Sequence, residues 1–447
     1  MAEVTSPIVS TPSEEVSKTS HIPLVLSNMT DEERAKTTAT VESIKTFIEQ
    51  ELSRQPSEFS IARLIDLLIA YASLTRTSDM HIDPTPENVR VRFRVDGILY
   101  DVFSLPKIIQ SLLVARTKIL CGLRTDEHQV PQDGRFKVLL KDIGTVDLRV
   151  SIVPTYYGEN VELRLLQSPS EKLTIDGLDM SPSDLAKVKR AMTRPYGMIL
   201  ATGPTGSGKT TMLYTILKTL NTPDVSVITI EDPIEYSIDG IEQIQINPQS
   251  GLTFAAGLRA ILRQDPNIIM VGEIRDEETA EIAVNAALTG HLLLSTLHTN
   301  DAATTLARLT EFKIEPFLIA STVNLAIGQR LVRLLCPYCR IPKTITEAEY
   351  QSLAEVIPIA FLGDNRQFFA AQGCEQCGQS GFIGRTGIYE VLLVDDAIRE
   401  AIMRRANANE IVALAMQKGM TTMLQDGFRK ALEGKTTVEE VLRVVHE

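Results

Sequence analysis

The segment 198–212, MILATGPTGSGKTTM, constrains this chain most, because an apolar run leads directly into a glycine-rich loop and then into helix-favouring residues. It fits the pattern G-x-x-x-x-G-K-[ST] in full, in the strand–loop–helix context that a phosphate-binding P-loop requires. Glycine lets backbone N–H groups approach phosphate oxygens, and the start of a helix favours negative charge. The pattern therefore predicts a nucleotide site formed by Gly203, Pro204, Thr205, Gly206, Ser207, Gly208, Lys209, Thr210 and Thr211. In such a site Lys209 reaches the β- and γ-phosphates and the Thr210 hydroxyl is a ligand of Mg²⁺.

Carboxylates follow two further apolar segments that have the character of buried strands. Glu231 and Glu235 come after the segment 225–230, and Glu273 comes after the segment 267–271. Ligands of open α/β sheets bind at the carboxyl ends of the strands. Glu273 is therefore predicted to be the Walker B carboxylate, which acts on Mg²⁺ and on the attacking water.

Strands alternate with helical segments through this part of the chain, which predicts a parallel, doubly wound α/β sheet. A further strand, 292–295, lies between His291 and His298. Because His298 follows the carboxyl end of that strand, it is a functional candidate, whereas most single histidines are structural.

The segment from about residue 59 to 168 is unusually rich in arginine. In NVRVRFRV, which begins at Asn88, apolar residues alternate with Arg90, Arg92 and Arg94, as in a half-buried strand, and Asp96-Gly97 favours a hairpin turn. We expect a small α/β domain here. Its arginines form either a solvated basic face or a face directed at the phosphates of another subunit, and the sequence leaves both hypotheses open.

Four of the five cysteines form two C-x₂-C pairs, which 34 residues separate. Two such pairs can close a tetrahedral zinc site, and a site with four thiolates is structural because no coordination position stays open. The alternative is four unrelated thiols, which leaves the repeated spacing unexplained. The fifth cysteine, Cys121, is expected in the core. The predicted zinc ligands are Cys336, Cys339, Cys374 and Cys377.

Composition narrows the classes of function. A net charge of −12, no tryptophan and 5% aromatic residues argue against a surface that coats nucleic acid. No N-K-x-D motif supports a GTP switch. The chain lacks an apolar run of about 18 residues and a basic-then-apolar leader, so we expect a cytosolic protein. Residues 1–37, rich in Ser, Thr, Pro and Glu, are expected to be a disordered tail that precedes an amphipathic helix.

Several longer motifs resemble those of the secretion-superfamily ATPases that power type IV pilus assembly and type II secretion. The resemblance covers about Phe59 to Glu447. GPTGSGKTT is accompanied by ITIEDPIEY, similar to the aspartate box, RQDPNIIMVGEIRDEETAEIA, similar to the Walker B region, and TGHLLLSTLHTND, similar to the histidine box. VRFRVDG, PQDGRF and RVSIVPTYYGENVELRLL resemble the second N-terminal domain of the family. The two cysteine pairs resemble its zinc insertion, which retraction motors generally lack.

The resemblance implies a RecA-like P-loop core (169–334) that follows a tail with a short helix (1–58) and a small PAS-like α/β domain (59–168). A tetracysteine zinc module (335–390) and a helical C-terminal region (391–447) come after the core. It implies that Glu231 and Glu235 order the metal and water, that His298 with His291 senses the γ-phosphate, and that Arg116, Arg135 and Arg149 face the nucleotide. In the strand before Glu273, Asn267 stands where many relatives have aspartate.

The resemblance further implies a homo-hexamer that uses ATP, Mg²⁺ and Zn²⁺ and works at the inner face of the cytoplasmic membrane. The expected partner is an inner-membrane platform protein, with pilin or pseudopilin engaged indirectly and no nucleic acid. About 58 residues precede the part of the chain that resembles the family, whereas many relatives have a longer N-terminal domain there that docks on a cytoplasmic adaptor, so the resemblance does not extend to that docking. A RecA-like nucleic-acid translocase is the alternative.

Overall fold

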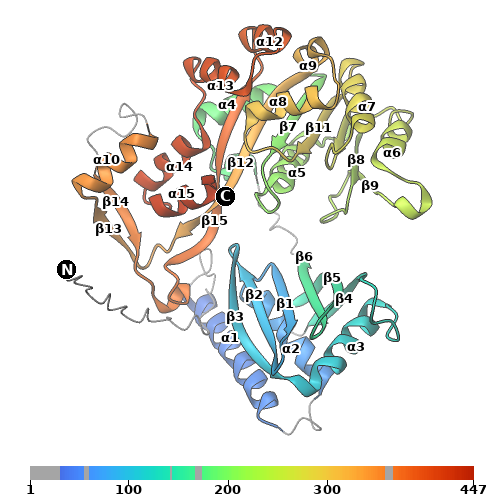
Figure 1. The fold of residues 1–447 in the computed structure, drawn as a ribbon, viewed down its shortest axis with the longest axis vertical. Coiled ribbons are helices and arrows are strands. Elements are labelled where there is room, and N and C mark those ends of the chain that lie inside the picture. The colour runs from blue at the N-terminus through green and yellow to red at the C-terminus, as the bar shows by residue number, and fades with distance from the viewer. Residues whose placement is uncertain (1–30, 55–59, 141–142, 167–173, 358–365, 447) are drawn as a thin grey trace, which may run out of the picture. The chain divides into compact units, whose positions relative to one another are not determined.

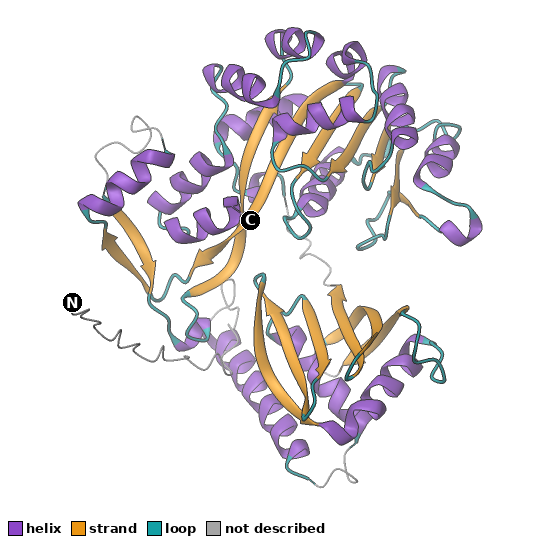
Figure 2. Cartoon of the chain, in the orientation of Figure 1, coloured by secondary structure: helices purple, strands orange, loops and turns teal. Residues whose placement is uncertain are grey.

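The computed structural model describes residues 31–54, 60–140, 143–166, 174–357 and 366–446, and the contacts within the chain define two compact units. The first unit extends to Leu165 and the second begins at Leu166. Figures 1 and 2 show a mixed α/β architecture in both. Among the described residues, every helix is too short or too polar to span a bilayer.

The first unit is a six-stranded sheet with helices on one of its faces (Figure 1). Its strand order is β3-β2-β1-β6-β5-β4. The strands are β1 (Asp79–Pro84), β2 (Asn88–Val95), β3 (Ile98–Pro106), β4 (Gln132–Leu140), β5 (Gly144–Thr155) and β6 (Gly158–Leu166). The helices are α1 (Asp31–Leu52), α2 (Ile61–Leu74) and α3 (Gln110–Cys121), with the short 3₁₀ segment η2 (Lys107–Ile109) before α3. Helix α1 begins before residue 38, so the predicted tail is helical from Asp31; its first 30 residues lie outside the described residues.

Local sequence explains this sheet. In β2, Val89, Val91 and Phe93 are fully buried and the arginines between them lie on the other face. The two-residue loop between β2 and β3 has positive φ at both Asp96 (49°) and Gly97 (89°), the geometry of a type I′ hairpin turn. The predicted strand and the predicted turn are therefore both confirmed.

The second unit is built on a seven-stranded sheet of order β15-β12-β7-β11-β10-β8-β9. The strands are β7 (Gly197–Thr202), β8 (Val227–Glu231), β9 (Glu242–Gln245), β10 (Ile268–Val271), β11 (Leu292–Leu297), β12 (Val323–Leu335) and β15 (Phe382–Leu393). All neighbouring pairs are parallel except β12 and β15, which run antiparallel. The predicted parallel, doubly wound sheet is confirmed.

Helices cover both faces of this sheet, and each face has its own apolar core. Successive residues of β7 alternate between the cores: Met198 and Leu200 belong to one, Ile199 and Ala201 to the other. The helices are α4 (Pro182–Met192), α5 (Lys209–Leu220), α6 (Phe254–Ile261), α7 (Glu277–Leu288), α8 (Ala302–Glu311) and α9 (Pro316–Thr322), with 3₁₀ segments η3 (Asp176–Leu178) and η4 (Pro248–Ser250). Since every residue of β7 is buried, the P-loop that follows it has a rigid base.

The C-terminal part contains a two-stranded sheet, β13 (Arg340–Thr344) with β14 (Gln367–Ala371), and mostly helices. These are α10 (Glu347–Val356), η5 (Glu375–Cys377), α12 (Asp396–Met403), α13 (Ala408–Gln417), α14 (Met423–Leu432) and α15 (Val438–His446). The sequence placed 335–390 in a module of its own. Instead, β15 pairs with β12 from Phe382 onward, so the end of that segment completes the core sheet. The sequence missed this because an antiparallel edge strand far along the chain leaves no local signal.

Candidate active site

The P-loop lies between β7 and α5, and its backbone requires glycine. Gly203, Gly206 and Gly208 have φ values of 143°, 79° and 87°, a region that residues with a Cβ rarely adopt. A Cβ on Gly203 would also come within 2.4 Å of the Gln329 carbonyl oxygen on β12. The loop therefore has the tight turns that aim backbone N–H groups at phosphates.

Lys209, the first residue of α5, is buried against this loop. Its Nζ donates hydrogen bonds to the carbonyl oxygens of Gly203 (2.7 Å) and Pro204 (2.9 Å). Burial lowers the pKa of Lys209 to about 8, the negative charge of Glu273 opposes that shift, and the positive charge of Arg330 adds to it. The ammonium group thus lies near the candidate carboxylate and near a second cation.

Glu273 is the second residue after β10 and is held from two sides. Its Oε2 lies 3.1 Å from His298 Nε2, and its Oε1 accepts a hydrogen bond from Arg275 Nη2. Burial raises the pKa of Glu273, but the hydrogen bond and charge of Arg275, with His298, outweigh burial and leave this pKa below its usual value. Glu273 is therefore ionised at neutral pH and fixed in orientation.

Sequence reasoning missed Arg275, which organises this edge of the sheet. Besides Glu273, its guanidinium reaches Asp232, with Nη1 3.6 Å from Oδ2. Arg275 belongs to the segment GEIRDEETAEIA, but an arginine among many charges carries no periodicity or spacing that singles it out. Only the three-dimensional approach of the ends of β8 and β10 shows its position.

The two histidines lie at opposite ends of β11, although the resemblance to the family pairs them. His298 follows the carboxyl end of β11, whereas His291 precedes its amino end. Six extended residues span about 20 Å, so His291 lies at the edge of the sheet opposite the P-loop. Its Nδ1 lies 2.9 Å from the Ala286 carbonyl oxygen at the end of α7.

The carboxylate of Glu231, the first acid of the aspartate box, makes its hydrogen bonds within the core. It is the last residue of β8 and 2% exposed. It accepts hydrogen bonds from Tyr214 Oη, from Thr229 Oγ1 (2.6 Å) and from Gln243 Nε2 (3.2 Å). These three hydrogen bonds fix the Glu231 carboxylate at the start of the aspartate box.

Glu235 lies four residues farther along the aspartate box, outside the strand. Its backbone N–H lies 3.4 Å from Tyr214 Oη, the same hydroxyl that donates to Glu231. Of this box, Asp232 is the residue that reaches Arg275 and so approaches Glu273.

The three arginines predicted to face the nucleotide do not share one face of their domain. Arg135 on β4 and Arg149 on β5 are directly opposite each other. A Cβ on the neighbouring Gly134 would lie 2.6 Å from Cys121 Cβ at the end of α3, so Arg135 points away from that helix. Arg116 is on α3 itself, close enough to Asp66 on α2 that its charge acts on that carboxylate, and it therefore lies on the helical side of the sheet. The sequence could not foresee this because helix packing decides it.

Most arginines on the open face of this sheet are paired within the domain. Arg135 makes a two-pronged contact with Asp147, at 2.8 and 2.7 Å. The other pairs are Arg92 with Asp83, Arg94 and Arg164 with Asp79, and Arg90 with Asp101. Within the described part of the chain, Arg149 has no ion pair within 4.0 Å. The hypothesis of a solvated basic face therefore fits most arginines of this face. Arg149 is the arginine on it whose guanidinium remains available to a ligand.

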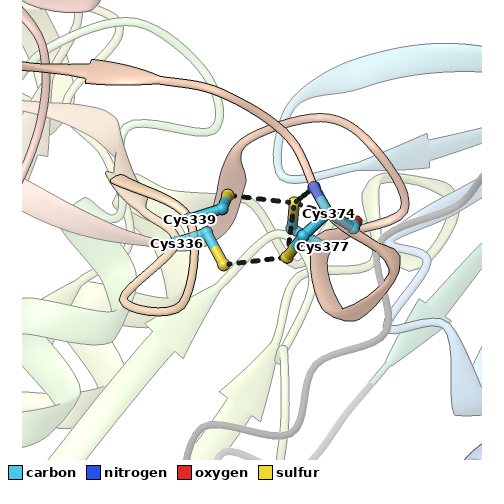
Figure 3. A group of neighbouring side chains, drawn as sticks. All are labelled: Cys336, Cys339, Cys374 and Cys377. Atoms are coloured by element: carbon cyan, nitrogen blue, oxygen red, sulfur yellow. Dashed lines mark hydrogen bonds between the residues drawn. The ribbon is translucent and has the colours of Figure 1, made fainter. Parts of the chain in front are cut away.

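The four predicted zinc ligands come together in one cluster (Figure 3). Three Sγ–Sγ separations, Cys336–Cys374, Cys339–Cys377 and Cys374–Cys377, are 3.8, 3.7 and 3.6 Å. Tetrahedral zinc with Zn–S bonds of about 2.3 Å requires sulfurs roughly 3.8 Å apart, so the cluster fits that ion. Backbone N–H groups of Cys374 and Gly381 each donate to Cys377 Sγ at 3.1 Å. With four sulfur ligands the metal would be structural, joining the end of β12 to the start of β15.

Replacing Cys374 with Ser should remove the zinc and loosen the segment 335–385. ATP binding at Gly203–Thr210 should survive, because the cluster follows the end of β12 at Leu335, well beyond Gly328, the residue of β12 that is in register with Thr202. Elemental analysis and limited proteolysis would measure the two effects. Cys121→Ser is the control, since Cys121 lies in the other unit and should leave the zinc content unchanged. Chelator-free protein with well under one zinc per chain would contradict the four-cysteine site.

The doubly wound sheet, the P-loop after β7 and the ionised glutamate after β10 together define a RecA-like P-loop ATPase. The family model described as "Type II/IV secretion system protein" matches residues 54–443, and the chain belongs to this family. It is thus a motor ATPase of the kind that drives pilus assembly or type II secretion. Nothing in the comparisons supports the nucleic-acid translocase.

Individual relatives agree with the family. The type IV pilus assembly ATPase PilB of Myxococcus xanthus is 44% identical over 88% of this chain and 69% of its own length. The type II secretion system protein E of Pseudomonas aeruginosa is 46% identical over 89% of this chain and 78% of its own. A crystal structure of the pilus retraction motor PilT with ADP shares 26% identity, covers 85% of this chain and 96% of that one, and has a TM-score of 0.58.

Proposed function

We propose that this ATPase hydrolyses Mg²⁺-bound ATP at the P-loop, with Glu273 orienting and deprotonating the attacking water. The observation that carries the assignment is the position of Glu273, which Arg275 and His298 hold beside the P-loop with its pKa depressed. A group in that state accepts a hydrogen bond from water at neutral pH. Lys209 would exchange the loop carbonyls of Gly203 and Pro204 for phosphate oxygens, which are stronger partners.

The residues at this edge also suit Mg²⁺. Magnesium prefers oxygen ligands and keeps several waters, and here the Thr210 hydroxyl follows Lys209 while Asp232 and Glu273 are the nearby carboxylates. When bound, the ion neutralises charge on the phosphates. Asn267 precedes the strand and its Oδ1 accepts the Ser226 N–H at 2.8 Å, at the far edge of the sheet, so it is not placed to act on the ion.

We further propose that the working form is a homo-hexamer that acts on an inner-membrane platform protein from the cytoplasmic side and so assembles a pilus or pseudopilus. The names of the relatives support this in general terms and divide between pilus assembly and type II secretion at similar identity. The four-cysteine cluster supports assembly rather than retraction, because retraction motors generally lack it.

Affinity purification of the full chain from its own cells, with the membranes solubilised in detergent, tests this. We expect a polytopic membrane protein and a complex of six subunits in light scattering with ATP. The same protein should show an ATPase rate that DNA and RNA leave unchanged. Strong stimulation by nucleic acid, without a membrane partner, would contradict the proposal.

A further inference from the structure

Strand β12 lies against the P-loop, and Gln329 in its middle contacts that loop. Gly328 of β12 is in register with Thr202, the last residue of β7. Gln329 and Arg330 therefore continue past the end of β7, alongside the loop. The fit is close: a Cβ on Gly208 would come within 2.8 Å of Gln329 Nε2.

Two polar side chains at this contact are buried with atoms that make no hydrogen bond. Gln329 is 3% exposed and Ser207 is 4% exposed, and both Gln329 Oε1 and Ser207 Oγ are without a partner. Buried polar atoms are nearly always paired, so two oxygens without a partner among the described residues are available to a polar ligand at the contact between β12 and the P-loop.

Arg330 adds charge to that contact. It is 6% exposed and close enough to Lys209 for its charge to act on that ammonium group. Two cations in one poorly hydrated place repel each other, so an anionic ligand bound between them would be stabilised by both.

We propose that Arg330 is a second phosphate-binding cation of the nucleotide site and that the subunit that supplies the P-loop also supplies it. The ligand is the phosphate chain of ATP, so the inference rests on the proposed function of the P-loop. A guanidinium suits this position because its planar fork holds two phosphate oxygens at once. Arg330 is distinct from the arginines of the first unit, since it comes from the same sheet as the P-loop.

The test compares ATP with adenosine, which lacks phosphates, by calorimetry on the full chain. Arg330→Gln should weaken ATP binding by at least about tenfold, the scale for a lost hydrogen bond to a charged group, and leave adenosine binding unchanged. Arg330→Lys should recover part of the loss, because it keeps the charge and loses the fork. Arg194→Gln is the control: Arg194 is exposed at the end of α4 and should change nothing.

Wild-type affinity for ATP in Arg330→Gln would overturn the proposal, and so would an equal loss for ATP and adenosine, which would indicate a packing role. If Arg330→Gln does not fold, Arg330→Lys carries the test, and its unchanged ATP affinity overturns the two-oxygen contact. Lys209→Ala distinguishes a failure of the Arg330 proposal from a failure of the proposed P-loop function. Wild-type ATP affinity in that variant would contradict the P-loop assignment itself.

Discussion

Replacing Glu273 with Gln should slow ATP hydrolysis by roughly 10²-fold or more while ATP still binds, the scale for losing a positioned general base. The amide keeps the size of the side chain and can still contact Arg275 and His298, but it cannot take a proton from water. Steady-state turnover and equilibrium nucleotide binding, measured on the same preparation, separate the two effects.

The matched control is Glu281→Gln on α7, a glutamate exposed to solvent a short way along the chain. It should hydrolyse ATP at the wild-type rate. A Glu273→Gln variant that does the same would show that another group activates the water.

Replacing Arg149 with Ala should depress turnover most among the arginines of the first unit, by up to about 10³- to 10⁵-fold if its guanidinium stabilises the transferring phosphoryl group. We expect this because the Arg149 guanidinium has no ion pair within the described residues and can bind a phosphate, whereas the Arg135 guanidinium is bound by Asp147. We expect a smaller loss for Arg135→Ala. ATP affinity should change little, because the charge acts when the γ-phosphoryl leaves.

Arg90→Ala is the control on the same face, since Arg90 is exposed and near Asp101. Mixing Arg149→Ala subunits with Lys209→Ala subunits shows where the arginine acts. If it serves a neighbouring subunit, some sites in mixed rings are intact and activity partly returns. Normal turnover in Arg149→Ala would show that this arginine, too, belongs to a solvated basic face and does not act on the nucleotide.

Patterns that are local in sequence predicted the structure well. The P-loop needs glycine at three consecutive tight turns, so its residues can be read from the chain. The hairpin at Asp96-Gly97 and the two C-x₂-C pairs are local in the same way. In each case the residues that form the feature are within a few positions of one another, or recur at a fixed spacing.

Features that depend on packing between distant segments could not be predicted. Arg275 reaches Asp232 only because β8 and β10 are neighbours, and Gln329 lies against Gly208 only because β12 is next to β7. His291 and His298 are near each other in sequence, but the extended strand between them puts the two at opposite edges of the sheet. The separation of two residues in the sequence does not predict their separation in space when an extended strand lies between them.

Steady-state phosphate release by the purified full chain with Mg²⁺ and ATP is the most direct test that the P-loop and Glu273 form one hydrolytic site. We expect hydrolysis that requires Mg²⁺, that falls to the background rate in Lys209→Ala because ATP is no longer held, and that falls in Glu273→Gln although ATP stays bound. Hydrolysis at the wild-type rate in both variants would contradict it.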